Sequence, residues 1–176
     1  EAGAEEIIFI HGFEFKKDVI SFFNKDFHKH FLQKTEGFSN VLKEIMINIS
    51  LENSDKILFG MPDTVFRGNP FHEMVTHEGI ACALFSTNDS SKVDRLYQNK
   101  QKFAVKQPKS WALQNRFWGL LKFDGINLLN MENTGQFSVH TEIGDILNLH
   151  DFACINADDY LDLGTWDNYN DYLKNY

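Results

Sequence analysis

The sequence predicts an α/β fold in which crossover helices connect the strands of a mixed, mostly parallel sheet. Three observations favour this fold class. Short continuous apolar runs, typical of strands buried on both faces, alternate with segments of helical periodicity between Glu5 and Phe59. Their order is strand, helix, strand, helix, strand, as in parallel sheets with helical crossovers. The chain has 176 residues, 43% of them hydrophobic, which is enough for one domain with a substantial core.

The first half of the chain supplies five elements. Strands are predicted over residues 5–10, 30–33 and 57–59, which are short apolar runs that end in polar or glycine-containing turns. A helix is predicted over residues 17–23, where the apolar residues share one helical face. A second helix is predicted after Ser39, which suits an N-cap position. That helix has four apolar residues at helical spacing, namely Val41, Leu42, Ile45 and Met46.

The second half adds further strands and helices in the same way. Strands are predicted over residues 79–86, 116–123 and 152–156, and helices over residues 142–149 and 166–176. The polar stretch over residues 88–102 reads as an excursion on the surface. No repeat or linker divides the chain, so we expect a single domain over residues 1–176. We expect it to be a three-layer αβα sandwich, Rossmann-like in its first half.

Charge and cysteine content exclude several classes of function. The net charge of −8 argues against binding DNA or RNA, which requires a basic face. It is compatible with a nucleotide, because a bound divalent metal inverts the local charge. No apolar run is long enough to cross a membrane, and no signal peptide opens the chain. Cys82 and Cys154 form no CxxC pair, which favours a reducing, cytoplasmic location.

Two aspartates follow predicted strands, where ligands bind in open α/β sheets. Asp63 lies in a Gly/Pro turn after one strand, and Asp162 alternates with apolar neighbours before Gly164 and Thr165. Taken singly, Asp63 suits a turn that bonds its own backbone, and Thr165 suits the N-cap of the last helix. Taken together, two carboxylates delivered from separate strand ends are suited to Mg²⁺, which keeps water and phosphate oxygens as its other ligands.

The residues around these aspartates carry a family resemblance. MPDTVF followed by YLDLGTWDNY resembles the sugar-1-phosphate nucleotidyltransferases, which make nucleoside diphosphate sugars. Three further segments match in the same order, namely EEIIFIHGFEFKKDVISFF, LQKTEGFSNVLKE and NRFWGLLKFDG. The resemblance covers residues 5–173 and implies the nucleotide-diphospho-sugar transferase type of α/β fold. It also implies transfer of a nucleotidyl group from an NTP to a sugar 1-phosphate, with release of pyrophosphate.

The resemblance assigns roles to individual residues. Asp63 and Asp162 match the aspartates that hold Mg²⁺ against the nucleotide phosphates, and Lys106 matches a lysine that contacts the sugar phosphate. Gln33 and Gly37 match residues that read the edge of the base. Gly119 matches a glycine that lets the sugar lie close to its strand.

Two other readings stay open. The family begins with a Gly-rich loop of the type GxGxRL, and residues 1–176 contain none. This favours a non-catalytic nucleotide-sugar-binding module of the same fold, or a domain that is N-terminally incomplete, since the chain starts at Glu1. A metal-dependent glycosyltransferase of related fold would also use paired acids, but Asp63-Thr64-Val65 is not a DxD element.

The remaining motifs favour structural roles. His28-x-His30 has no third ligand at metal-site spacing and reads as a solvated pair rather than a zinc site. No GxSxG turn or activated cysteine supports nucleophilic catalysis. An aromatic stripe in the last helix is expected to pack on the core or on a partner, which leaves a homo-oligomer open. Its members are Trp166, Tyr169, Tyr172 and Tyr176.

Overall fold

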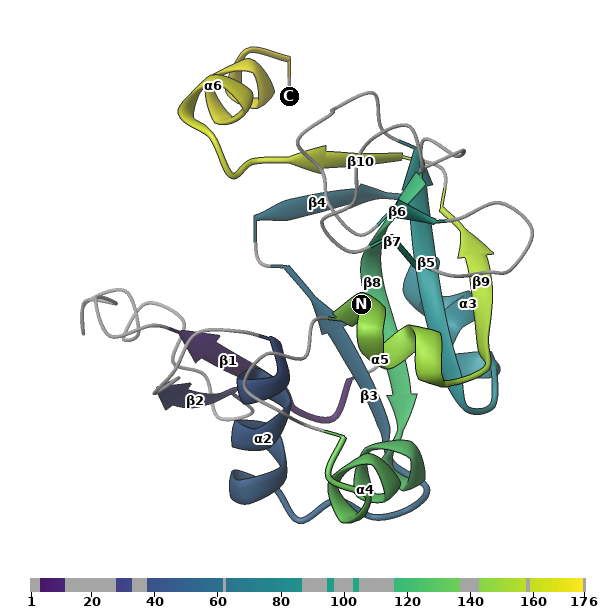
Figure 1. Ribbon diagram of the computed structural model, residues 1–176. Helices are drawn as coiled ribbons and strands as arrows, with labels where there is room; N and C mark the ends of the chain where they lie inside the picture. The colour runs from purple at the N-terminus through teal and green to yellow at the C-terminus, as the bar shows by residue number, and fades with distance from the viewer. Residues whose placement is uncertain are drawn as a thin grey trace.

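Figure 1 shows the computed structural model of the chain. The structure describes residues 4–11, 28–32, 38–61, 63–86, 95–96, 103–104, 116–136, 143–157 and 159–175. The helix predicted over residues 17–23 lies outside them.

The described strands and helices follow the predicted order, with additions. The strands are β1 (Ile7–His11), β2 (His28–Leu32), β3 (Lys56–Gly60), β4 (Thr64–Arg67), β5 (Ile80–Ser86), β6 (Arg95–Leu96), β7 (Phe103–Ala104), β8 (Arg116–Asp124), β9 (Phe152–Asn156) and β10 (Asp159–Asp162). The helices are α2 (Phe38–Asn48), α3 (Pro70–Thr76), α4 (Gly125–Asn133), α5 (Ile143–Leu149) and α6 (Trp166–Asn175). No helix among these residues is long and apolar enough to cross a membrane.

Strand β8 determines how the described strands pair. It runs antiparallel to β5 along one edge and antiparallel to β3 and β6 along the other. Because β3 and β5 both oppose β8, they point the same way, and β9 pairs with β5 in parallel. The strand directions therefore suit an α/β fold, but β8 lies between β3 and β5. The expectation of a mostly parallel sheet is wrong for the described strands, which pair mostly antiparallel.

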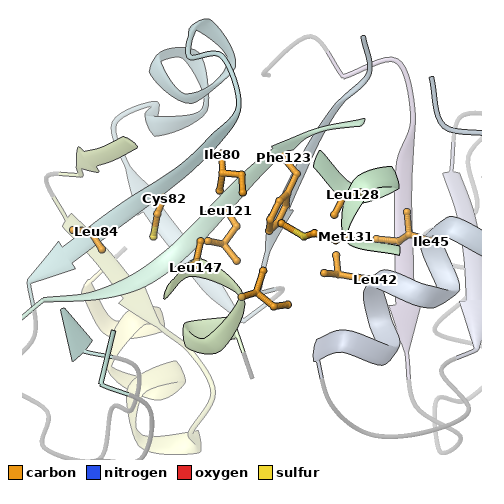
Figure 2. Close-up of a cluster of buried hydrophobic side chains, with 11 residues drawn as sticks. Leu42, Ile45, Ile80, Cys82, Leu84, Leu121, Phe123, Leu128, Met131 and Leu147 are labelled. Carbon is orange, nitrogen blue, oxygen red and sulfur yellow. The ribbon is translucent and has the colours of Figure 1, made fainter. Parts of the chain in front are cut away.

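Strand β5 is buried on both faces, as its continuous apolar run predicts. Ile80, Cys82 and Leu84 point into one cluster of buried side chains, together with residues of β8 and of three helices (Figure 2). The helical members are Leu42 and Ile45 of α2, Leu128 and Met131 of α4, and Ile146 and Leu147 of α5. Leu42 and Ile45 confirm the apolar face predicted for α2, although that helix begins at Phe38 and includes Ser39 in its first turn.

The alternate residues of β5 face a second core cluster. Ala81, Ala83 and Phe85 are fully buried there, against Met74 of α3 and Ile155 of β9. Helices therefore line both faces of β5, with α3 on the second face. The three-layer, Rossmann-like sandwich stays a prediction, since the described pairing matches it only in part.

Two described helices are absent from the sequence prediction, and both are short. Helix α3 begins with Pro70 after Asn69, whose side-chain oxygen accepts a hydrogen bond from the His72 N–H at 3.3 Å. Helix α4 begins directly after Asp124. At this N-terminus, Asn127 Oδ1 accepts a hydrogen bond from the Asp124 N–H at 3.1 Å. The sequence carries these capping signals, but neither helix has a long enough apolar periodicity to be recognised without them.

A buried lysine lies near the end of β8. Lys122 of β8 has no exposed surface, and its ammonium group donates to His77 O at 2.6 Å and Gly79 O at 2.9 Å. Its third partner is the Asp124 carboxylate, which also accepts a hydrogen bond from the Gly79 N–H. All three donors are satisfied, so this buried charge holds the turn before β5 to the end of β8.

Replacing Lys122 tests the importance of this buried ion pair. Lys122→Met leaves the Asp124 carboxylate, which is only 18% exposed, without its cation. We expect the free energy of unfolding to fall by about 3 kcal/mol, the usual loss when one partner of a buried pair is removed. Urea denaturation measures this. The control is Lys174→Met, because the Lys174–Asp171 pair is exposed and its loss costs about 0.5 kcal/mol or less. Equal losses in the two variants would contradict the prediction.

The Cys82 thiol is predicted to be unreactive in the folded protein. Burial raises the pKa of Cys82 well above its ordinary value, and the neighbouring Cys154 raises it further. Because the thiolate is the reactive form, we expect Cys82 to react with a disulfide reagent at pH 8 roughly 100-fold more slowly than in denaturant. A Cys154→Ser variant isolates this thiol, and Cys82→Ser serves as the control. Rapid modification of folded Cys154→Ser would contradict the prediction.

Candidate functional site

The two sequence-predicted metal ligands lie on a ribbon formed by strands β4 and β10, seen near the top of Figure 1. The strands are antiparallel, with Thr64 opposite Asp162 and Phe66 opposite Tyr160. The ribbon extends one residue further, because the Leu163 N–H donates to Asp63 O at 2.7 Å. We call β4, β10, Asp63 and Leu163 the aspartate ribbon.

The aspartate ribbon brings Asp63 and Asp162 to neighbouring backbone positions. Asp63 directly precedes Thr64, which is the partner of Asp162. Likewise Leu163, which bonds to Asp63, directly follows Asp162. The two aspartates are distant in the sequence, so this juxtaposition depends entirely on the pairing of β4 with β10.

The Asp63 carboxylate is available to a ligand. It is exposed, and it has no hydrogen-bond or ion-pair partner among the residues that the structure describes. The turn interpretation, in which Asp63 bonds its own backbone, is therefore not observed. By contrast Asp55 accepts a hydrogen bond from the Glu52 N–H at 2.8 Å, as a structural turn aspartate does.

The donor set fits a hard cation that retains water. The described residues contain no group of three or more His, Cys, Asp or Glu side chains arranged to hold a metal. On the family resemblance, Asp63 and Asp162 would provide two carboxylates and leave other positions to water or substrate phosphate. Mg²⁺ accepts this arrangement, because it dehydrates reluctantly and binds through one or two carboxylates plus phosphates.

The end of the ribbon continues into helix α6. Thr165 Oγ1 accepts a hydrogen bond from the Asn168 N–H at 3.2 Å, and Thr165 O accepts one from the Tyr169 N–H at 3.0 Å. The N-cap predicted for Thr165 is confirmed. Asp162 is separated from α6 only by the short connection from Leu163 to Thr165. The start of α6 therefore determines where the chain leaves the candidate site.

Aromatic side chains attach the ribbon to the main sheet. The ring of Phe66 on β4 stacks on Phe85 of β5, with centroids 5.4 Å apart. Tyr160 on β10 also packs against Phe85, at 5.3 Å. Phe71 of α3 meets Phe66 edge to face at 5.6 Å. Sequence reasoning missed this cluster, because its members come from four separate elements and no local pattern shows that they meet.

Gly119 lies beside the same cluster, on strand β8. It is buried, and a Cβ atom placed there would lie 2.3 and 2.5 Å from two ring carbons of Phe85. Packing against Phe85 therefore explains why position 119 has no side chain. Its contact with a sugar stays a prediction from the family resemblance.

The other predicted binding residues lie outside the described residues. They are Gln33 and Gly37 for the base and Lys106 for the sugar phosphate. The structure therefore places Asp63 and Asp162 at neighbouring backbone positions, places Gly119 beside Phe85, and leaves the other three assignments as predictions.

The described residues of the aromatic stripe of α6 are not buried in the core. No described residue of α6 is buried, and Trp166 and Leu173 are 79% and 58% exposed. Trp166 and Tyr169 contact each other edge to face, with centroids 6.0 Å apart. Figure 1 shows α6 standing apart from the sheet, beyond the end of β10. The expectation that the stripe packs on the core or on a partner therefore stays a prediction.

Comparisons with known proteins identify the fold. No family model and no curated protein matches the sequence. Among solved structures, a protein named as a glucose-1-phosphate thymidylyltransferase of Bacillus anthracis, in complex with sucrose, matches with a TM-score of 0.75. That match has 19% identity and covers 95% of this chain and 74% of the other.

Two further matches point the same way. A UTP-bound UGPase from Acinetobacter baumannii has a TM-score of 0.71 and 14% identity, and the match covers 98% of this chain and 77% of the other. A UDP-glucose pyrophosphorylase from the same organism has a TM-score of 0.69 and 15% identity, over 97% and 76%. These neighbours are sugar-1-phosphate nucleotidyltransferases. The chain therefore has a mixed α/β fold of the kind found in those enzymes.

Proposed function

We propose that this chain is a sugar-1-phosphate nucleotidyltransferase. It would use Mg²⁺ to transfer a nucleotidyl group from an NTP to a sugar 1-phosphate, giving a nucleoside diphosphate sugar and pyrophosphate. The observation that carries this proposal is the juxtaposition of Asp63 and Asp162 on the aspartate ribbon. The fold shared with nucleotidyltransferases supports it.

In the proposed reaction an oxygen of the sugar 1-phosphate attacks the α-phosphorus of the NTP. The bond from that phosphorus to the bridging oxygen breaks, and pyrophosphate leaves. Such phosphoryl chemistry requires positioning and neutralisation of charge rather than a protein nucleophile. This agrees with a chain whose described residues supply carboxylates and whose buried Cys82 is a poor nucleophile.

Different residues of the chain would position the metal, the sugar phosphate and the base. Asp63 and Asp162 would hold Mg²⁺, which supplies neutralisation of the phosphate charge when it is bound. Lys106 would bind the sugar phosphate, and Gln33 and Gly37 would orient the base. The exposed, unpaired Asp63 carboxylate supports the first assignment, since no protein donor competes for it among the described residues.

Neutralising either aspartate is expected to abolish the metal-dependent reaction. Asp63→Asn and Asp162→Asn each remove one anionic ligand, so we expect kcat to fall roughly 100-fold or more. The measurement is pyrophosphate release from UTP or dTTP with glucose 1-phosphate, across a titration of Mg²⁺. Asp151→Asn is the matched control, because Asp151 is exposed and lies between α5 and β9, away from the ribbon.

The assay also decides between the proposal and the binding module. Unchanged turnover in Asp162→Asn would overturn the metal assignment. If the wild-type chain binds UDP-glucose in calorimetry but releases no pyrophosphate from any NTP, the chain is a nucleotide-sugar-binding module instead.

A further inference from the structure

One aromatic ring joins the aspartate ribbon to the core. Phe85 is fully buried at the end of β5 and packs against Phe66 of β4 and Tyr160 of β10. Phe66 and Tyr160 are register partners, so the same ring contacts both strands of the ribbon at one level. Along the chain, Phe66 comes three residues after Asp63, and Tyr160 comes two residues before Asp162.

The position of the Phe85 ring depends on Gly119. The pairing of β5 with β8 shifts register between Ala83 and Leu84, so that no residue of β5 is paired with Gly119. The Phe85 ring lies over this irregular position, close enough that any Cβ at Gly119 would overlap it. The ring is fully buried, and Phe66 and Tyr160 pack against it, so a displaced ring would press on the ribbon.

We propose that Gly119 is a positioning residue for the aspartate pair. Its missing side chain lets the Phe85 ring lie beneath the ribbon, where contacts with Phe66 and Tyr160 set the place of β4 and β10 relative to the sheet. A side chain at Gly119 displaces the ring, and the ribbon moves or opens with it. The metal-binding part of this inference rests on the proposed function, whereas the mechanical part does not.

This assignment differs from a direct role of Gly119 in sugar binding. A residue that admits the sugar affects the KM for sugar 1-phosphate and leaves the ribbon unchanged. A residue that acts through Phe85 affects the ribbon first, and its effect disappears when the ring is removed. The two roles are therefore separable by combining substitutions at Gly119 and Phe85.

The test is a double-mutant cycle of Gly119→Ala and Phe85→Val. Valine removes the ring atoms that a Cβ at Gly119 would meet. We expect Gly119→Ala to accelerate amide exchange of Leu163 roughly tenfold, because this N–H closes the ribbon onto Asp63 O. In the Phe85→Val background, adding Gly119→Ala should produce no further acceleration, since residues that act through one contact are not additive.

A second glycine provides the matched control. A Cβ at Gly125 would lie 1.9 Å from Glu52 O, so Gly125→Ala also strains the protein, but at the other end of β8. There the Gly125 N–H donates to Asp55 O at 2.7 Å. We expect Gly125→Ala to accelerate exchange at the neighbouring Ile126 amide, whose N–H bonds Asn53 O, and to leave Leu163 unchanged. Gly119→Ala should give the reverse pattern.

Binding of Mn²⁺, followed by electron paramagnetic resonance, is the functional readout. We expect Gly119→Ala to weaken Mn²⁺ binding roughly tenfold, and Gly125→Ala to leave it unchanged. Unchanged Leu163 exchange in Gly119→Ala, or full additivity in the cycle, would overturn the inference. If Gly119→Ala fails to fold, the double variant decides: folding as well as Phe85→Val supports the inference, and failure to fold overturns it.

The outcomes also separate this inference from the proposed function. If the wild-type chain binds no Mn²⁺ and releases no pyrophosphate, the metal-dependent function fails. The exchange of Leu163 in the four proteins of the cycle still decides whether Gly119 acts on the ribbon through Phe85.

Discussion

Strand β5 is the element around which both the core and the candidate site are arranged. Its side chains alternate between two buried clusters, so the strand has no face that water reaches except at its last residue. On one face it packs against helices α4 and α5, and on the other against α3 and the aromatic side chains of the ribbon. Burying both faces of one strand removes a large apolar area from water and fixes the two layers relative to each other.

The end of β5 couples this core to the candidate site. Phe85 is the last buried residue of the strand, and its ring packs against Phe66 and Tyr160 of the ribbon. The aspartates therefore lie on a small two-stranded ribbon whose position comes from aromatic packing, not from membership of the main sheet. This packing supports the ribbon from the core side while the Asp63 carboxylate stays exposed, as the proposed metal site requires.

Lys122 contributes rigidity at the opposite end of the same pair of strands. A buried ammonium group is costly to desolvate, and here the cost is offset by three acceptors, two of them backbone carbonyls. These bonds fix the turn that precedes β5 and the start of α4. Together with Gly119 and Phe85 at the other end, they constrain how β5 and β8 lie against each other along their whole length.

The sequence by itself determined most local structure. Continuous apolar runs located β3, β5, β8 and β9, and helical spacing located α2, α5 and α6, because these signals depend only on which neighbouring side chains are buried. The sequence also singled out Asp63 and Asp162 and the cap at Thr165. Short helices such as α3 and α4 were not predicted, because their apolar faces span only about two turns.

The tertiary structure decided which strands and which side chains lie next to each other. The place of β8 between β3 and β5, which makes the pairing mostly antiparallel, follows from long-range packing that no local pattern encodes. The pairing of β4 with β10, which joins the two aspartates, and the fit of the Phe85 ring over Gly119 are likewise contacts between distant segments. Local residue patterns thus chose the elements and the candidate ligands. Only packing between elements brought those ligands together, because their proximity depends on contacts far apart in the chain.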